Sequence, residues 1–248
     1  MQTALRLQYF FVQFCAANKV IINTNLTMTP GNNPFRQHHQ IARTILFNAA
    51  VELCNTNFIN VAEGNRSLTR MEVVLYKYQS YSLQEYSMLE TLISQYGNSF
   101  PSQVSSVYQL TASMASRMYY LIPLYDSAVS SDCKKDIGFA ICKAFTEFVA
   151  YSIYQMSQNE KLVNPLLWSY YGEDTILLLQ DILSTSLELL IADQGRKKVD
   201  HDDLTNWLKS AKKSVPGYIF DHLHSIASAV VPERLNNLVS INSPAFVA

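Results

Sequence analysis

Residues 131–156 read SDCKKDIGFAICKAFTEFVAYSIYQM. Apolar side chains return in this stretch every three or four residues, the spacing that keeps them on one face of an α-helix. They are Ile137, Ala140, Ile141, Ala144, Phe145, Phe148, Val149 and Ile153. The alternating pattern of a strand forms no convincing run, because residues 20–22 are too few to build a sheet. The stretch therefore predicts a long buried helix inside an all-α fold.

Helical patterns continue on both sides of this run, separated by residues that start and end helices. Capping-box patterns begin at Thr69 and Ser82, each with a glutamate three residues later, and predict helix starts. Gly97 and Pro123 predict helix ends. The further predicted helices cover residues 4–17, 37–55, 69–79, 82–97, 101–121, 164–172, 174–192, 200–212, 216–231 and 232–239.

A domain boundary is predicted where polarity rises, over residues 158–162, just before Pro165. We therefore expect an N-terminal helical domain over residues 1–158 and a smaller helical domain over residues 162–248. The chain of 248 residues is long enough for either one large domain or two modest ones.

Charge is sparse and unevenly distributed along the chain. Charged residues make up 16% of the sequence, and the net charge of −1 gives no global field that would recruit nucleic acid or anionic lipid. Residues 1–80 hold seven Lys/Arg and three Asp/Glu, a net +4, whereas residues 81–190 hold five and eleven, a net −6. The positive first part and the negative middle part of the chain could meet in head-to-tail packing of identical copies. Ordinary solvated faces would explain the same pattern.

The four cysteines are Cys15, Cys54, Cys133 and Cys142. They form no CxxC pair and have neither disulfide-framework nor zinc-knuckle spacing, so we expect four reduced core thiols and a cytosolic or nuclear compartment. Polar residues interrupt the apolar residues 5–22, which predicts a buried helix and not a membrane span or a cleaved signal.

Motifs of catalysis are missing from the sequence. The chain has seven glycines, without a phosphate-cradling loop, and it lacks a nucleophile elbow. We therefore predict no catalytic residue, no cofactor and no small-molecule substrate. One acid and histidine cluster could serve hard-metal chemistry, although capping of a helix start is the simpler reading. Its members are Asp200, His201, Asp202, Asp203, Asp221, His222 and His224.

Basic residues form two loose groups that could meet phosphates or anionic lipid. They are Arg36, Arg43, Arg66, Arg70 and Lys77, and then Arg196, Lys197, Lys198, Lys209, Lys212 and Lys213. His38 and His39 lie between the first two arginines and are candidate pH sensors, because protonation there would add charge to a positive surface. A plain solvated helix face is the alternative.

Several segments, in order, resemble one protein family. They are residues 26–30 (LTMTP), 36–49 (RQHHQIARTILFNA), 71–78 (MEVVLYKY), 115–122 (ASRMYYLI), 128–131 (AVSS) and 139–150 (FAICKAFTEFVA). Together they resemble the orthomyxovirus matrix protein over roughly residues 20–155. The resemblance implies an all-α, multi-helix N-terminal domain of two packed helical subdomains, followed by a smaller helical C-terminal domain.

The same resemblance implies a viral structural protein that carries out no catalysis. Such a protein polymerises beneath the envelope, on its inner face in the virion, and bridges an anionic membrane surface and the viral ribonucleoprotein. It would occur in host cytoplasm and nucleus and would not be secreted.

The sequence departs from the family's pattern at two places. Residues 77–82, where an arginine-rich surface helix would fall, are nearly uncharged, which puts nuclear import and nucleic-acid contact there in doubt. No histidine follows Cys142 within residues 143–162, so a zinc site is not supported. The chain thus resembles a divergent, less basic member of the family.

Two other functions fit parts of the sequence. An RNA-coating viral nucleoprotein would need the basic residues to converge on one groove. A helical ligand-binding or metal-dependent protein would need the groups between Asp200 and His224 to converge on a pocket.

Overall fold

The apolar run of residues 131–156 forms helix α5 (Ser131–Gln158) in a computed structural model that describes residues 35–191 and 201–229. Ile141, Phe145 and Val149 on its apolar face are fully buried. The described residues form helices and contain no strand, which confirms the predicted all-α class. The helices predicted over residues 4–17 and 232–239 lie outside the described residues.

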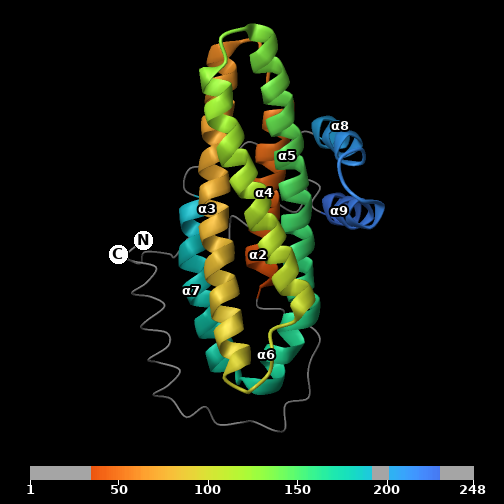
Figure 1. Cartoon of the computed structure of the whole chain (residues 1–248). Helices are drawn as coiled ribbons and strands as arrows, with labels where there is room; N and C mark the ends of the chain where they lie inside the picture. Colours follow the sequence, from red (N-terminus) through yellow and green to blue (C-terminus); the bar gives the residue numbers. More distant parts are fainter. Residues whose placement is uncertain (1–34, 192–200, 230–248) are drawn as a thin grey trace, which may run out of the picture. The chain divides into compact units, whose positions relative to one another are not determined.

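Helices before and after α5 follow most of the predicted pattern (Figure 1). Within the described residues three helices precede it, namely α2 (Arg36–Cys54), α3 (Val61–Ser94) and α4 (Ser102–Ser127). A π-helical segment, η1 (Asn159–Val163), continues it directly. The remaining described helices are α6 (Asn164–Tyr170), α7 (Glu173–Ile191), α8 (His201–Ala211) and α9 (Gly217–Ala229).

The two capping boxes predicted at Thr69 and Ser82 are wrong, because α3 runs through both without a break. Thr69 Oγ1 donates to the Asn65 carbonyl one turn earlier, at 2.9 Å, and caps nothing. The real start lies at Asn60, whose Oδ1 accepts the Glu63 backbone N–H at 3.3 Å. The helix continues through the predicted break because apolar side chains on both sides of it are buried. They include Met71, Val74, Leu75, Tyr78 and Tyr81.

Gly97 and Pro123 had both been predicted to end helices, and only Gly97 does so. Gly97 follows α3 with φ +72°, the left-handed conformation that glycine adopts without strain, and its N–H donates to the Ser94 carbonyl. Pro123, in contrast, lies inside α4, which ends at Ser127. The neighbouring Ile122 and Tyr125 are buried, and this packing offsets the loss of one backbone hydrogen bond.

The described residues fall into two compact units, and each unit takes segments from several helices. Unit 1 contains residues 35–42, 75–112 and 155–191, and unit 2 contains residues 43–74, 113–154 and 201–229. Residues 158–162, predicted as a boundary between domains, form the end of α5 and most of η1. The division into domains at 1–158 and 162–248 stays a prediction.

Helix α8 is tied to unit 2 through Trp207, which is 2% exposed. Its indole Nε1 donates to Thr146 Oγ1 on α5 at 3.2 Å. Its ring meets the Phe47 ring of α2 edge-on, with the centroids 5.5 Å apart. These contacts combine a large apolar area with a satisfied indole N–H, so they fix where α8 lies within the unit.

Candidate functional site

The π-helical segment η1 brings polar side chains into the interior of unit 1. The Asn164 backbone N–H donates to the Asn159 carbonyl, five residues earlier, which defines the wider π turn. Asn159 is fully buried in η1, and the next residue, Glu160, reaches the same cluster of side chains. π-Turns often mark functional positions.

His39 of α2 lies at the centre of this cluster and is fully buried. Its Nε2 is 2.7 Å from Glu85 Oε1 of α3, and its Nδ1 is 2.7 Å from Glu160 Oε1 of η1. The Phe35 ring stacks on the imidazole at a centroid distance of 5.9 Å. A carboxyl oxygen at each ring nitrogen favours the protonated, cationic imidazole, because only that form has two N–H donors.

The electrostatics of the cluster agree with a cationic His39. Burial acts to lower the pKa of His39, but the negative charge of Glu85 and the hydrogen bonds to Glu160 and Glu85 outweigh it, and the net pKa is raised above 6.5. The pKa of Tyr108 on α4 is well above its usual value, chiefly because of burial and then because of the Glu85 charge. Both shifts favour the protonated forms of these residues.

Hydrogen bonds extend the cluster to α4. Tyr108 OH donates to Glu85 Oε2 at 3.1 Å and accepts from Asn159 Nδ2 at 2.7 Å. Asn159 Oδ1 has no partner among the described residues. We call the set His39, Glu85, Tyr108, Asn159 and Glu160 the buried polar cluster.

A second buried hydrogen-bonded link lies in the same unit. Thr111 Oγ1 of α4 donates to Gln155 Oε1 at 3.0 Å, and Gln155 Nε2 donates to Ser82 Oγ of α3 at 2.8 Å. Ser82, predicted as a helix cap, is thus an interior acceptor. Polar contacts of this kind specify one alignment of the helices, because each unsatisfied group would cost about 1–3 kcal/mol.

The geometry of the buried polar cluster favours a structural role over general acid–base catalysis. A general base needs a nitrogen lone pair in reach of a substrate. Both nitrogens of His39 are occupied by carboxylates, and its side chain has no exposed surface. The cluster holds parts of α2, α3, α4 and η1 together.

Sequence reasoning missed four of the five cluster residues. Glu85 was assigned to a helix cap, and Asn159 and Glu160 to a polar boundary. The available signal was that Glu85 shares a helical face with Tyr78, Tyr81 and Leu89, all of which are buried. A carboxylate on such a face needs an interior partner.

His38 and His39 do not lie on a solvated surface, in contrast to the prediction. Both are buried, and His38 Nε2 is 2.6 Å from Ser184 Oγ of α7. Protonation of His39 would therefore place a positive charge between two carboxyl groups in the interior and add none to a positive surface. Their assignment as pH sensors is untested, but the mechanism first attached to it does not apply.

The basic residues differ in exposure. Arg43 is buried, 6% exposed, because it follows the apolar face of α2, so it is unsuited to the predicted membrane or ribonucleoprotein contact. Lys77 is half-buried, and three arginines are exposed, Arg36, Arg66 and Arg70. Arg70 is paired with Glu52. In the second group, Lys209, Lys212 and Lys213 are exposed, while residues 196–198 lie outside the described residues.

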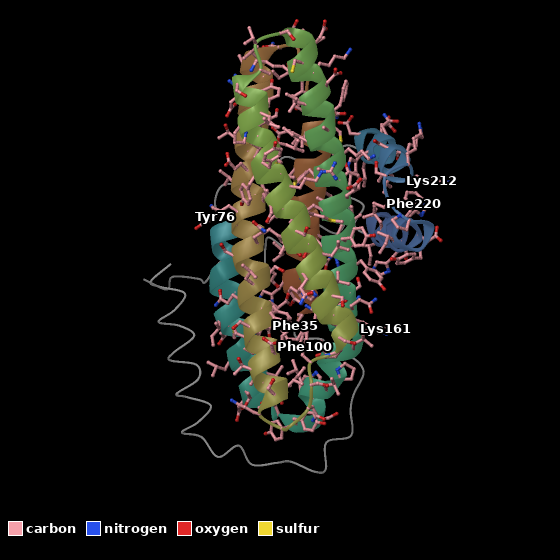
Figure 2. The ribbon with its side chains drawn as sticks, viewed as in Figure 1. Phe35, Tyr76, Phe100, Lys161, Lys212 and Phe220 are labelled. Atoms are coloured by element: carbon pink, nitrogen blue, oxygen red, sulfur yellow. The ribbon has the colours of Figure 1, made fainter. Side chains whose placement is uncertain are left out.

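Helices α8 and α9 carry the described members of the acid and histidine cluster. Asp202 and Asp203 occupy the first turn of α8, where a negative charge interacts favourably with the helix dipole. His222 packs edge-on against Tyr154, and His224 lies near Phe220. The Phe220 ring is 5.7 Å from Lys212 Nζ, and both residues are labelled in Figure 2. Within residues 35–191 and 201–229, no group of three or more His, Cys, Asp or Glu is placed to hold a metal. Asp200 and the side chain of His201 are not described.

The described cysteines are all free thiols, but they differ in burial. Cys142 is buried and Cys54 is half-buried, close to the prediction of core thiols. Cys133 is exposed in the first turn of α5, so its assignment to the core is wrong. Cys15 lies outside the described residues.

One helical stretch of the described chain, Ser131–Tyr170, is long and apolar enough to cross a membrane, judged by length and composition only. Its most apolar window is 61% buried inside the structure, as it would be in an ordinary core helix. Comparison of the chain with protein-family models, curated proteins and solved structures gives no match. The function must therefore be argued from the residues themselves.

Proposed function

We propose that this chain is a non-enzymatic structural protein that assembles with copies of itself into a layer, as a viral matrix protein does beneath an envelope. Its partners would be an anionic membrane surface on one side and a ribonucleoprotein on the other. The resemblance over residues 20–155 motivates the proposal.

The observation that supports the proposal is that some charged residues are paired in the interior while several cations are exposed. The interior histidine pairs with two glutamates inside unit 1. Arg36, Arg66 and Arg70, in contrast, are exposed, and Arg66 belongs to none of the described ion pairs. Three lysines follow closely at the end of α8, at positions 209, 212 and 213. Surface cations of this kind suit contact with phosphate-bearing partners or with acidic segments of a neighbouring copy.

Vesicle flotation and sedimentation velocity test the proposal with the full-length protein. We expect binding to phosphatidylcholine vesicles only when they contain phosphatidylserine, and oligomers that grow with concentration and shrink with salt. Replacing Lys209, Lys212 and Lys213 together by Glu should weaken vesicle binding at least tenfold. The matched control replaces Lys135, Lys143 and Lys161 by Glu, which makes the same charge change at other exposed positions.

Equal loss in both triple variants would mean that only net charge matters. A protein that stays monomeric at high concentration and ignores anionic vesicles would overturn the proposal. Tight binding to long single-stranded RNA, with affinity falling steeply with salt, would instead favour a nucleoprotein.

A further inference from the structure

Two cysteines that are far apart in the sequence lie together in unit 2. Cys54 is the last residue of α2, and Cys142 lies on α5. Cys142 contacts the carbonyl of Leu53, the residue before Cys54, and Cys54 contacts Thr146, one helical turn after Cys142, so both thiols lie at the same contact between α2 and α5. Cys54 is partly exposed, whereas Cys142 is buried. Cys54 is therefore the more exposed residue of the pair.

The surroundings hold this pair in place. Cys142 Sγ is 3.3 Å from the Leu53 carbonyl of α2, and Cys54 Sγ is 3.9 Å from Thr146 Oγ1 of α5. The same Thr146 hydroxyl accepts the indole N–H of Trp207 at 3.2 Å. Both thiols therefore lie in a packed region, and one tryptophan is connected to Cys54 through a single hydroxyl.

The two thiols have different reactivity. The hydrogen bond from Cys142 lowers the pKa of Cys54, with help from Thr146 and against the effect of burial. The hydrogen bond with Cys54, then burial and the Cys54 charge, raise the pKa of Cys142. The thiolate is the reactive form of cysteine. The lowered pKa therefore favours Cys54 as the attacking sulfur, and the raised pKa keeps Cys142 as a thiol.

We propose that Cys54 and Cys142 are a redox-active dithiol, a modification site that a hydroperoxide such as hydrogen peroxide converts into a disulfide. The Cys54 thiolate attacks one peroxide oxygen, the O–O bond breaks, and the departing hydroxide takes up a proton to become water. Cys54 is then a sulfenic acid. The Cys142 sulfur attacks the Cys54 sulfur, the S–O bond breaks, and hydroxide leaves with the Cys142 proton as a second water.

The balance of the reaction is complete. Two thiols lose two electrons and two protons, and one hydrogen peroxide takes them up to become two waters. Conversion of Cys54 to the uncharged sulfenic acid also removes the charge that had helped to hold Cys142 in the thiol form. The first step therefore makes the second easier.

Peptide mapping of the intact, full-length protein tests the proposal. After brief exposure to hydrogen peroxide, we expect a Cys54–Cys142 linked peptide that disappears with dithiothreitol. The Cys133→Ser variant should form the same link, because the Cys133 thiol that it lacks lies outside the pair. The Cys142→Ser variant should stop at a Cys54 sulfenic acid that dimedone traps.

Fluorescence gives an independent readout in the folded protein. The other tryptophan of the chain is Trp168. In a Trp168→Phe background, oxidation should change the emission of Trp207, and reduction should restore it. The same treatment of the Cys54→Ser variant should leave the emission unchanged. The proposal is overturned if wild-type protein yields no linked peptide, or if peroxide modifies Cys133 while the Cys54 and Cys142 thiols stay reduced.

Discussion

At the scale of single residues, His39 is the group most strongly fixed by its surroundings. It pairs with two glutamates through its two ring nitrogens, and Tyr108 and Asn159 complete the shell around them. Removing the proton from His39 would leave two carboxylates near one another with less positive charge between them. The cluster therefore couples folding to pH.

The sign of that coupling follows from the raised pKa of His39. The folded protein holds the proton more tightly than the unfolded chain, so the stabilisation is complete below about pH 6.5 and is lost as pH rises through the raised pKa. We expect the urea midpoint of the wild-type protein to fall over that window. The His39→Gln variant should be less stable at neutral pH, and its midpoint should change less with pH.

An exposed histidine provides the control for this experiment. His224→Gln removes an imidazole at the surface and should keep the wild-type pH dependence. A His39→Gln variant with the full wild-type slope would show that other groups cause the dependence.

At the scale of helices, close packing in unit 2 depends on small residues. Gly138 of α5 lies against the ring of Phe58, and a Cβ at that position would overlap the ring. Phe58 is itself 3% exposed and packs edge-on against Tyr125, so it has little room to move. The helices approach closely here because Gly138 has no side chain.

We therefore expect Gly138→Ala to destabilise the protein by about 1–2 kcal/mol. Overpacking costs about 1–3 kcal/mol, and this exceeds the helix-propensity gain of up to about 1 kcal/mol. Urea unfolding measures the change. Gly217→Ala in α9 is the matched control, since a Cβ there meets nothing within 4 Å and should be neutral or stabilising. A stabilised Gly138→Ala variant would contradict the close contact.

Helix existence could be predicted from the sequence, but interior polar contacts could not. The period of the apolar residues in α5 depends on one segment alone, and it gave the element almost to its ends. The role of Glu85 depends on His39 and Glu160, which come from other segments, so a local pattern assigned it to a cap. Arg43 was misplaced for the same reason, because only packing reveals which face of α2 is buried.

The π turn was also beyond local patterns. Residues 158–161 are polar, and polarity in a sequence usually indicates exposure to solvent. In η1 the same polarity serves buried hydrogen bonds, because the wider turn directs Asn159 and Glu160 to the cluster.

At the scale of the whole molecule, the two units interleave along the chain. Unit 1 needs residues 155–191 to complete segments that begin at residue 35, and unit 2 needs α8. The predicted N-terminal domain, residues 1–158, would lack Glu160 and Trp207. We expect a fragment of residues 1–158 to unfold without a cooperative transition in urea, whereas the full chain unfolds cooperatively.

Adding residues 159–248 as a separate fragment should restore cooperative unfolding, because it supplies the contacts that the fragment of residues 1–158 lacks. A fragment of residues 1–158 that unfolds as sharply as the full chain would instead support the predicted domain boundary.

Interleaving also affects how the protein is made. Synthesis proceeds from the N-terminus, and domains that are continuous in sequence can fold as soon as they leave the ribosome. Here neither unit has all its described segments until residue 191 for unit 1 and residue 229 for unit 2 have emerged. During most of translation the apolar faces of α2–α5 therefore lack some of the segments that they pack against in the folded protein, a condition that favours premature association between copies.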